Sequence, residues 1–238
     1  MGTALTTAGR AAGLDLTLVG RDDLARACAD AEVALLCAPD GEIPAAAAAV
    51  TAAAPSLRLI GHTSGATELD ALTPADANGP EAFSLHPLQT IPDGDATLVG
   101  APAAIEGTSP EALALAGDLA EALGMRPFEL PAGSRAAYHA AASMASNFLI
   151  ALEESAASLL TDAGVEDARE LLAPLVLRTA ANWAEGGAAA LTGPIARGDE
   201  ETVSRHLEAI AATSPELEPL YRELATRTRA LAREGSRA

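Results

Sequence analysis

Short apolar runs alternate with helical stretches along the first half of the chain. The runs at residues 14–19, 33–38 and 57–61 have the length and composition of buried strands. Residues 22–29 and 44–53, which lie between them, favour helices, and the second stretch has a proline at its first turn. Strands that alternate with helices predict an α/β domain built on a parallel sheet.

The same alternation continues toward the middle of the chain. Further strands are expected at residues 82–85, 103–106 and 127–130. A helix is expected to open at Ser109, because a serine followed by proline and glutamate is typical of a helix start. We therefore expect a first, α/β domain over residues 1–131.

After residue 131 the strand signals stop. Residues 134–162 form an apolar-rich pattern that predicts a single helix of up to about 29 residues, about 43 Å long. A small domain cannot cover such a helix alone, so we expect residues 132–238 to form an all-helical domain that pairs two copies into a homodimer. Further helices are expected at residues 167–184, 200–212 and 215–233, with Asp199 and Ser214 as the N-caps of the last two.

The composition excludes several kinds of partner. The chain has 33 acidic and 15 basic residues and a formal net charge of −18, which argues against nucleic acid and anionic membranes. All basic residues are arginine, so a lysine that forms a Schiff base or donates a proton is excluded. A small anionic substrate must then be held by locally placed arginines.

Neither a metal site nor membrane insertion is expected. Cys28 and Cys37 are the only cysteines and lack CxxC spacing, so we interpret both as buried thiols. No signal-peptide pattern is seen, and the longest alanine-rich apolar stretch, residues 43–54, is too short to span a bilayer. We expect a cytoplasmic protein.

A polar stripe interrupts the alanine-rich pattern at residues 138–147. On a helix, His139, Ser143 and Asn147 stand at i, i+4 and i+8 and share one face. A proton donor beside hydroxyl and amide groups suits the reduction of a carbonyl, so these three are the candidate catalytic residues. The alternative is a solvated helix face.

The first residues match the end of a dinucleotide-binding turn. Gly2, followed by Thr3 and a helix, fits the last glycine of a G-x-G-x-x-G motif, so both are candidate cofactor-binding residues. The preceding strand and the two earlier glycines are missing, and we expect them to be encoded upstream of Met1. The alternative is an ordinary helix that opens with a glycine.

Other candidate ligand-binding residues follow predicted strands. Arg21 lies at the position where the second strand of a dinucleotide-binding fold ends. An arginine there can pair with the 2′-phosphate of NADP. The adjacent Asp22, however, is the residue type that favours NAD. A surface arginine is the alternative. Ligands of open α/β sheets bind beyond the carboxyl ends of the strands. The candidates there are Pro39, Asp40 and Ser64 for the cofactor and His86 for the substrate, with a structural role in the turn as the alternative for Ser64 and His86.

Three further segments of the chain are specific enough to indicate a family. The segments are His62-Thr63-Ser64-Gly65, Ser84-Leu85-His86-Pro87-Leu88-Gln89-Thr90 and Leu191-Thr192-Gly193-Pro194-Ile195-Ala196-Arg197-Gly198-Asp199. Together with residues 138–147, they resemble bacterial proteins in which a Rossmann-like domain precedes a DUF2520 domain. That family resembles ketopantoate reductases, pyrroline-carboxylate reductases and 6-phosphogluconate dehydrogenase-like proteins, and the resemblance covers essentially the whole chain.

The resemblance implies roles for the polar stripe. In ketopantoate reductases a helix after the Rossmann domain carries a lysine and two asparagines at i, i+4 and i+8. The same spacing places His139 at the lysine, as general acid, and Ser143 and Asn147 at the asparagines. Arg197, on a loop fixed by glycines and a proline, is expected to hold a substrate carboxylate, with an internal arginine–aspartate brace as the alternative.

These observations favour an NADP-dependent reductase of a small 2-oxo acid, with ketopantoate and pantothenate biosynthesis as the named candidates. Two alternatives stay open. One is a noncatalytic dinucleotide-binding or scaffold protein, which the missing glycine turn and the missing lysine favour. The other is an imine reductase that resembles the pyrroline-carboxylate enzymes, because the sequence does not separate C=O from C=N reduction.

Overall fold

The computed structural model describes residues 1–72, 79–92 and 97–235. The chain divides into two compact units, Met1–Ser146 (unit 1) and Asn147–Ala238 (unit 2). The division falls after helix Arg135–Ala145 (α5), later than the expected one at residue 131, because α5 is bonded through its first residue to the strands of unit 1.

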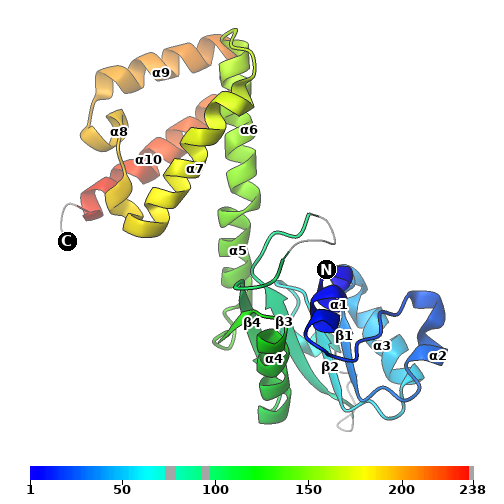
Figure 1. Ribbon diagram of the computed structural model, residues 1–238. Helices are drawn as coiled ribbons and strands as arrows, with labels where there is room; N and C mark the ends of the chain where they lie inside the picture. The colour runs from blue at the N-terminus through cyan, green and yellow to red at the C-terminus, as the bar shows by residue number, and fades with distance from the viewer. Residues whose placement is uncertain (73–78, 93–96, 236–238) are drawn as a thin grey trace. The chain divides into compact units, whose positions relative to one another are not determined.

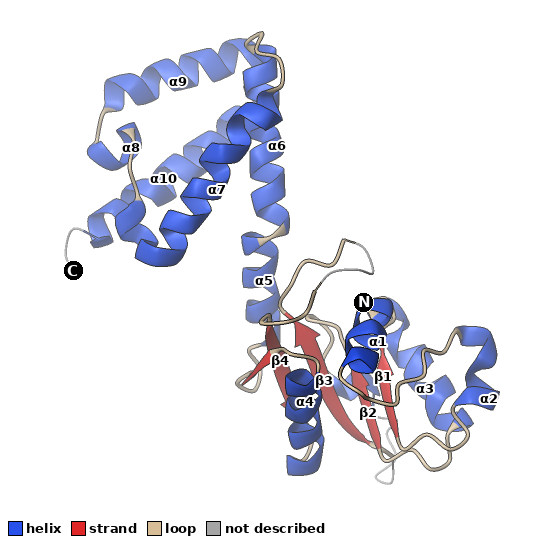
Figure 2. Cartoon of the chain, viewed as in Figure 1, coloured by secondary structure: helices blue, strands red, loops and turns tan. Residues whose placement is uncertain are grey.

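Unit 1 is built on a five-stranded sheet with helices packed on it (Figures 1 and 2). The strand order is β1-β2-β3-β4-β5, and every neighbouring pair is parallel except β3 and β4. The α/β class predicted for this half is therefore confirmed. The strands are Val33–Leu36 (β1), Leu59–His62 (β2), Glu81–Pro87 (β3), Pro102–Gly107 (β4) and Arg126–Glu129 (β5), and the helices before α5 are Gly2–Ala11 (α1), Leu24–Ala27 (α2), Ile43–Ala53 (α3) and Pro110–Ala122 (α4).

The antiparallel pair differs from the expected all-parallel sheet. A parallel pair needs a crossover connection that carries the chain back, usually through a helix. The α3 and α4 helices supply such connections for β1–β2 and β4–β5. No helix is found in the described part of the connection from β3 to β4, so the chain turns back directly and the pair is antiparallel.

The strand expected at residues 14–19 is not formed. The segment has no regular secondary structure and joins no strand, and Leu18 is 55% exposed. Within the described residues the outer edge of β1 stays unpaired, because residues 14–19 do not hydrogen-bond to it. An apolar run becomes a strand only when it pairs with a neighbour, and the prediction was wrong here.

The sheet is covered on both faces. On one face, Ile43, Ala47 and Val50 of α3 pack against Ile60 of β2. On the other, Phe83 packs with residues of α4. The α4 helix starts as predicted, because the Ser109 hydroxyl accepts the Ala112 N–H at 3.1 Å.

The single long helix expected at residues 134–162 is two helices. Helix α5 ends at Ala145, and a second helix, α6, begins at Asn147. Between them Ser146 has φ −117° and ψ −76°, which interrupts the helical backbone. Serine and asparagine favour helix ends because their side chains compete for backbone groups. The sequence had predicted that Asn147 continues the helix face of His139 and Ser143. Because the helix is interrupted at Ser146, it does not.

Unit 2 is helical throughout its described residues, as expected. Asp199 caps its helix as predicted, since its carboxylate accepts the Thr202 N–H at 3.1 Å. Ser214 makes no such side-chain cap; its hydroxyl donates to Asp162 Oδ2 at 2.7 Å instead. The helices are Asn147–Asp162 (α6), Ala168–Gly186 (α7), Pro194–Arg197 (α8), Glu200–Thr213 (α9) and Glu218–Gly235 (α10).

Neither a candidate membrane span nor a candidate metal site is found in the described residues. No helix there combines the length and the apolar character that crossing a lipid bilayer requires. Residues 1–72, 79–92 and 97–235 also hold no group of three or more histidine, cysteine or acidic side chains placed to bind a metal ion.

Candidate functional site

The carboxyl ends of β2 and β3 bring the candidate site together in unit 1. The two strands are parallel and in register, with His62 opposite Ser84. Their last residues therefore lie at the same edge of the sheet, where open α/β sheets bind ligands. The loop after β2 supplies Ser64 and Gly65, and β3 supplies His86 near its end.

Arg135, the first residue of α5, fastens that helix to this edge. Its side chain is fully buried, and Nη1 donates to the Ser64 carbonyl oxygen at 2.9 Å. Nη2 donates to the Ser84 hydroxyl and pairs with Glu106 of β4. The guanidinium therefore connects α5 to three segments of the sheet edge and fixes where the rest of α5 lies. Sequence reasoning missed this residue.

The next turn of α5 presents Tyr138 and His139 to the site. The Tyr138 hydroxyl lies 2.6 Å from His86 Nδ1, and the two rings are nearly perpendicular, at 86°. The His139 ring also meets the His86 ring edge-on, with centroids 6.3 Å apart. Two histidines and a tyrosine from β3 and α5 thus form one cluster, which we call the His–Tyr–His cluster.

Gly65 makes room for the two histidine rings. A Cβ atom at this position would lie 2.7 Å from His139 Nδ1 and 2.9 Å from His86 Nε2, closer than real Cβ contacts occur. His139 Nδ1 is buried and has no hydrogen-bond partner among the described residues. A residue with a side chain at position 65 would displace the rings, so the cluster depends on this glycine.

Burial keeps the hydrogen-bonded pair uncharged. Desolvation, with smaller contributions from His139 and Arg135, lowers the pKa of His86 to about 4. Desolvation also raises the pKa of Tyr138 to about 12. At neutral pH both partners therefore enter their hydrogen bond in the neutral form.

His62 lies at the end of β2, beside Ser84 on the neighbouring strand. It is fully buried, and neither ring nitrogen has a hydrogen-bond partner among the described residues. Desolvation, followed by the charge of Arg135, lowers its pKa to about 4. A neutral His62 is therefore packed at the end of β2.

The residues predicted for the cofactor lie near the ends of β1 and β2. A Cβ atom on Gly2 would lie 3.4 Å from Cys37 Cβ, so the N-terminus of α1 abuts the residue that follows β1. The first turn of α1, which includes Thr3, has no acidic residue and no side-chain cap from Met1. Its free N–H groups fit the pyrophosphate of a dinucleotide. The adjoining turn, Asp40–Glu42, begins after Pro39.

Two other predicted cofactor residues have partners within the protein. Arg21 forms an ion pair with Glu42, so its exposed guanidinium is not free for a 2′-phosphate unless that pair opens. The side chain of Asp22 lies outside the described part of the chain. The Ser64 hydroxyl accepts the N–H groups of Ala66 and Thr67, at 3.1 and 2.9 Å, so it bonds within its own turn.

The remaining predicted residues lie outside the His–Tyr–His cluster. Ser143 lies one turn beyond His139 on α5, half-buried. Asn147 and Arg197 belong to unit 2, where they begin α6 and end α8. The residues that sequence reasoning passed over, Arg135 and Tyr138, precede His139 by four and one positions. Arg135 at i−4 shares a helix face with His139, which was the signal available.

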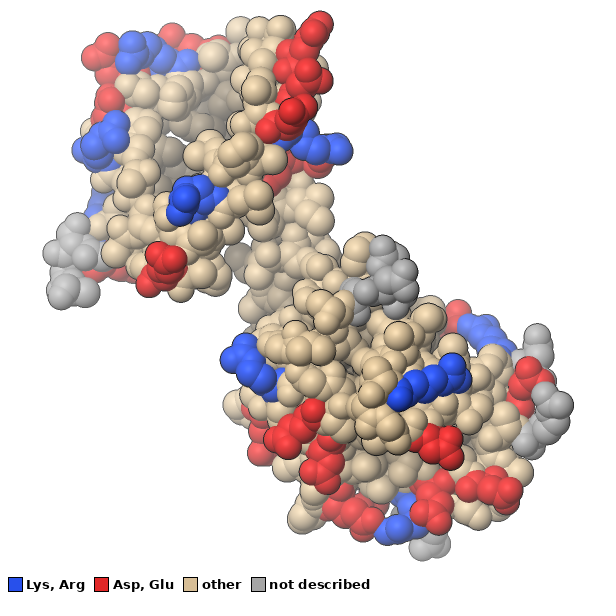
Figure 3. Space-filling model, viewed as in Figure 1, with Lys and Arg blue, Asp and Glu red and all other residues tan. Residues whose placement is uncertain are grey.

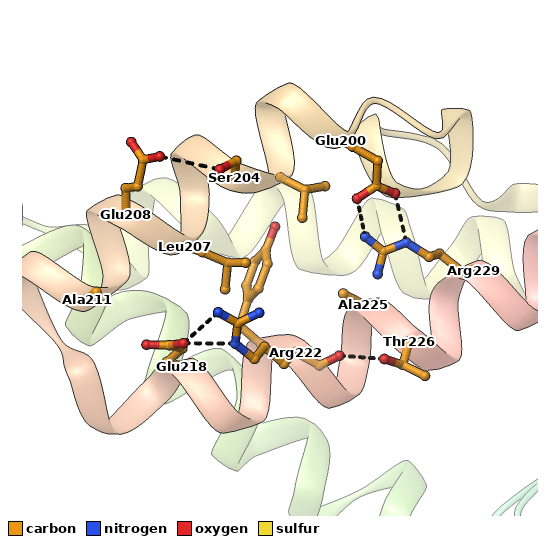
Figure 4. A pocket seen from close by; sticks show the side chains of 12 residues that line it. Glu200, Ser204, Leu207, Glu208, Ala211, Glu218, Arg222, Ala225, Thr226 and Arg229 are labelled. Atoms are coloured by element: carbon orange, nitrogen blue, oxygen red, sulfur yellow. Dashed lines mark hydrogen bonds and ion pairs between the residues drawn. The ribbon is translucent and has the colours of Figure 1, made fainter.

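A separate groove of about 670 Å³ runs between α9 and α10 in unit 2 (Figure 4). Leu207 and Ala225 contribute apolar walls. The two arginines that line it are already paired, Arg222 with Glu218 and Arg229 with Glu200. These guanidinium groups are satisfied within the protein, so the groove is a weaker candidate for chemistry than the His–Tyr–His cluster.

Several solved structures are similar to this chain. A candidate NADP oxidoreductase from Bacteroides fragilis is 23% identical, with a TM-score of 0.78, and the match covers 96% of this chain and 93% of that one. Pyrroline carboxylate reductase from Plasmodium falciparum, solved with NADP bound, is 13% identical with a TM-score of 0.58 over 98% and 94% of the two chains. Reductive aminase from Aspergillus terreus, in complex with NADPH, is 23% identical with a TM-score of 0.57 over 90% and 77%.

These similarities define a Rossmann-like α/β protein with an all-helical second part. No curated protein matches the sequence. The family model described as "Domain of unknown function (DUF2520)" matches residues 101–228, more than half of the chain. The chain therefore belongs to the DUF2520 family, as its sequence motifs had indicated.

Proposed function

We propose that this protein is an NADP-dependent reductase of a small carbonyl compound, with 2-oxo acids as the substrate class and ketopantoate as the first candidate. The observation that carries the proposal is the His–Tyr–His cluster at the carboxyl edge of a Rossmann-like sheet. Polar side chains that exchange protons are placed there beside the edge where such sheets bind dinucleotides.

The residues of unit 1 fit a nicotinamide dinucleotide. Gly2 and Thr3 at the start of α1 would hold its phosphates, and the turn that begins at Asp40 would border it. When bound, the reduced nicotinamide supplies a hydride. The NADP and NADPH complexes of the similar reductases support the 2′-phosphorylated form, and an Arg21 released from Glu42 could recognise it.

His139 is the proposed general acid. Its Nδ1 faces Gly65 and is buried, which leaves Nε2 as the nitrogen to protonate the oxygen of the reduced carbonyl. Tyr138 and His86, bonded to each other, position the His139 ring and exclude water from one side of it. Arg135 holds α5, and with it both Tyr138 and His139, against the strands.

The proposal is tested by NADPH oxidation in the presence of ketopantoate and a panel of other small 2-oxo acids. We expect turnover by the full chain and a loss of about 100-fold or more in kcat for His139→Ala. His206→Ala is the matched control, because His206 also bonds a tyrosine but lies on α9 in unit 2. That control should keep wild-type activity.

Calorimetric titration with NADPH separates the reductase from a noncatalytic protein. NADPH binding with no turnover on any substrate of the panel contradicts the reductase and supports the dinucleotide-binding or scaffold function. Full activity of His139→Ala removes that residue from the mechanism.

A second candidate function is imine reduction. Pyrroline carboxylate reductase and reductive aminase are among the similar structures, and a proton donor beside the reacting carbon serves C=N as well as C=O reduction. Adding a cyclic imine carboxylate to the panel distinguishes the two functions by the ratio of kcat/KM values.

A further inference from the structure

The Nδ1 atom of His139 is buried and has no hydrogen-bond partner among the described residues. Buried polar groups are nearly always bonded, so an unbonded nitrogen on the proposed general acid needs an explanation. A Cβ atom on Gly65 would lie 2.7 Å from this nitrogen and 2.9 Å from His86 Nε2. The two histidine nitrogens, one from α5 and one from β3, therefore lie close to the same point.

The bond to Tyr138 determines which nitrogen of His86 carries the proton. The Tyr138 hydroxyl lies 2.6 Å from His86 Nδ1 and has no other hydrogen-bond partner among the described residues. A phenolic oxygen is a weak acceptor, because its lone pairs are delocalised into the ring, whereas an imidazole nitrogen is a strong acceptor. The hydroxyl therefore donates to Nδ1. Burial lowers the pKa of His86 to about 4, so at neutral pH its single proton lies on Nε2.

This arrangement also favours one tautomer of His139. With a donor at His86 Nε2, an acceptor at His139 Nδ1 is favoured, because two N–H groups that approach each other repel. The two rings meet edge-on with centroids 6.3 Å apart, and the hydrogen bond between them is open in this structure. Catalytic hydrogen bonds are often long in a free enzyme and tighten when the substrate binds. The proton of a neutral His139 then lies on Nε2, the nitrogen assigned to the substrate.

We propose that Tyr138, His86 and His139 form a proton relay that ends at the substrate oxygen. The relay rests on the proposed reductase function and deepens it. Once the carbonyl carbon has accepted the hydride, the electron pair of the broken π bond lies on the oxygen. That oxygen takes the proton of His139 Nε2. At the same time His139 Nδ1 takes the proton of His86 Nε2, and His86 Nδ1 takes the proton of Tyr138.

Water supplies the proton that restores Tyr138. The residue is half-buried, so part of it meets solvent. Burial raises its pKa to about 12, which makes the tyrosinate a strong base that takes a proton from water and leaves hydroxide. The rest of α5 offers no competing charge: residues 136–145 contain no acidic or basic side chain besides His139, and Figure 3 shows the visible side of this helix as uncharged. His86 thus acts through His139 and is a positioning and relay residue.

The first test locates the protons by long-range ¹⁵N NMR of the imidazole rings, without cofactor or substrate. The full chain has four histidines, so single substitutions assign their signals. At pH 8 we expect the Nε2–H tautomer at both His86 and His139, and Tyr138→Phe should let His86 populate both tautomers. Tyr221→Phe is the matched control and should alter His206 alone. An Nδ1–H tautomer at His86 or at His139 in the wild-type protein overturns the relay.

The second test separates a relay from a purely positioning role. His86→Gln keeps a hydrogen-bond acceptor and a donor but has no proton to pass on. It should lower kcat by about tenfold or more with little change in KM, and Tyr138→Phe should do the same. The two variants lie on different elements, so one stays informative if the other does not fold. Tyr221→Phe is again the control and should keep wild-type kcat.

Mixtures of H₂O and D₂O count the protons that move in the reaction. The kcat of the wild-type protein should fall along a curve as the deuterium content rises, because several protons move together, and along a straight line in His86→Gln. A straight line for the wild-type protein, or wild-type kcat in His86→Gln, overturns the relay even where the reductase function holds. An absence of turnover on the whole substrate panel contradicts the reductase instead, and the NMR measurement still decides whether the tautomers form the chain.

Discussion

The two units each contain a histidine bonded to a tyrosine, and the two pairs are close to identical in geometry. His86 Nδ1 and the Tyr138 hydroxyl are 2.6 Å apart, with ring centroids at 5.5 Å. His206 Nδ1 and the Tyr221 hydroxyl are 2.7 Å apart, with centroids at 5.9 Å. Both ring pairs meet edge-on, at 86° and 90°.

Their surroundings are what differ. The pair in unit 1 joins β3 to α5 next to the buried Arg135 and a second histidine ring. The pair in unit 2 joins α9 to α10 and is exposed. Burial lowers the pKa of His86 to about 4, and it raises the pKa of Tyr138 to about 12. The contact itself therefore does not define a site; the burial and the neighbours around it do.

The largest expected difference between the two units is the loss of unfolding free energy when an ion-paired arginine is replaced. Arg135→Met leaves Glu106 and the Ser64 carbonyl without their buried partner and should lower the free energy of unfolding by about 3–5 kcal/mol. Arg229→Met removes an ion pair whose Glu200 is well exposed, and it should cost about 1 kcal/mol or less. Urea unfolding of both variants measures the two values. Equal costs would contradict the contrast between the units.

The second prediction concerns pH. The pKa values of His62 and His86 are about 4 in the folded protein and near 6.5 in the unfolded chain. As the pH falls below 6.5 the unfolded chain takes up protons that the folded protein does not bind. The contribution of these two histidines to stability is thus full above pH 6.5 and is lost down to about pH 4, by on the order of 1 kcal/mol per histidine and pH unit.

Urea unfolding between pH 7 and pH 5 measures this slope. His86→Asn should make the loss shallower by about one proton, and His62→Asn should act in the same way. An unchanged slope in both variants would show that other groups carry the pH dependence.

Local signals in the sequence predicted part of this architecture. The caps at Ser109 and Asp199 were found because a cap depends on residues three positions away. The prediction of a strand at residues 14–19 was wrong, because strand formation depends on pairing with a neighbour that local composition does not reveal. The break at Ser146 was missed because the apolar pattern continues across it.

The candidate site was predictable to a similar extent. Helical spacing singled out His139 and Ser143, which do lie on one helix. The bond between His86 and Tyr138 joins residues 52 positions apart, and Arg135 meets Ser84 across 51. Such contacts depend on how α5 meets the sheet, which no local pattern in the sequence encodes.

The third prediction tests the space at Gly65. Gly65→Ala places a methyl group against the His139 and His86 rings, which are held by burial and by the bond to Tyr138. Overpacking of this kind costs about 1–3 kcal/mol, and displaced rings should also lower kcat. Gly20→Ala is the matched control, because no atom lies within 4 Å of its added Cβ. Thermal unfolding and NADPH oxidation measure both effects.

The smallest effect is expected from the two tyrosine hydroxyls. Tyr138→Phe leaves the half-buried His86 Nδ1 without its partner, and Tyr221→Phe leaves the exposed His206 Nδ1 open to water. An unsatisfied buried group costs about 1–3 kcal/mol, whereas water replaces the lost partner at an exposed one, so the second variant should lose about 0.5 kcal/mol or less. Guanidinium unfolding of the two variants at pH 7 compares them directly. If Tyr221→Phe proves as costly as Tyr138→Phe, then burial does not explain the contrast between the two pairs.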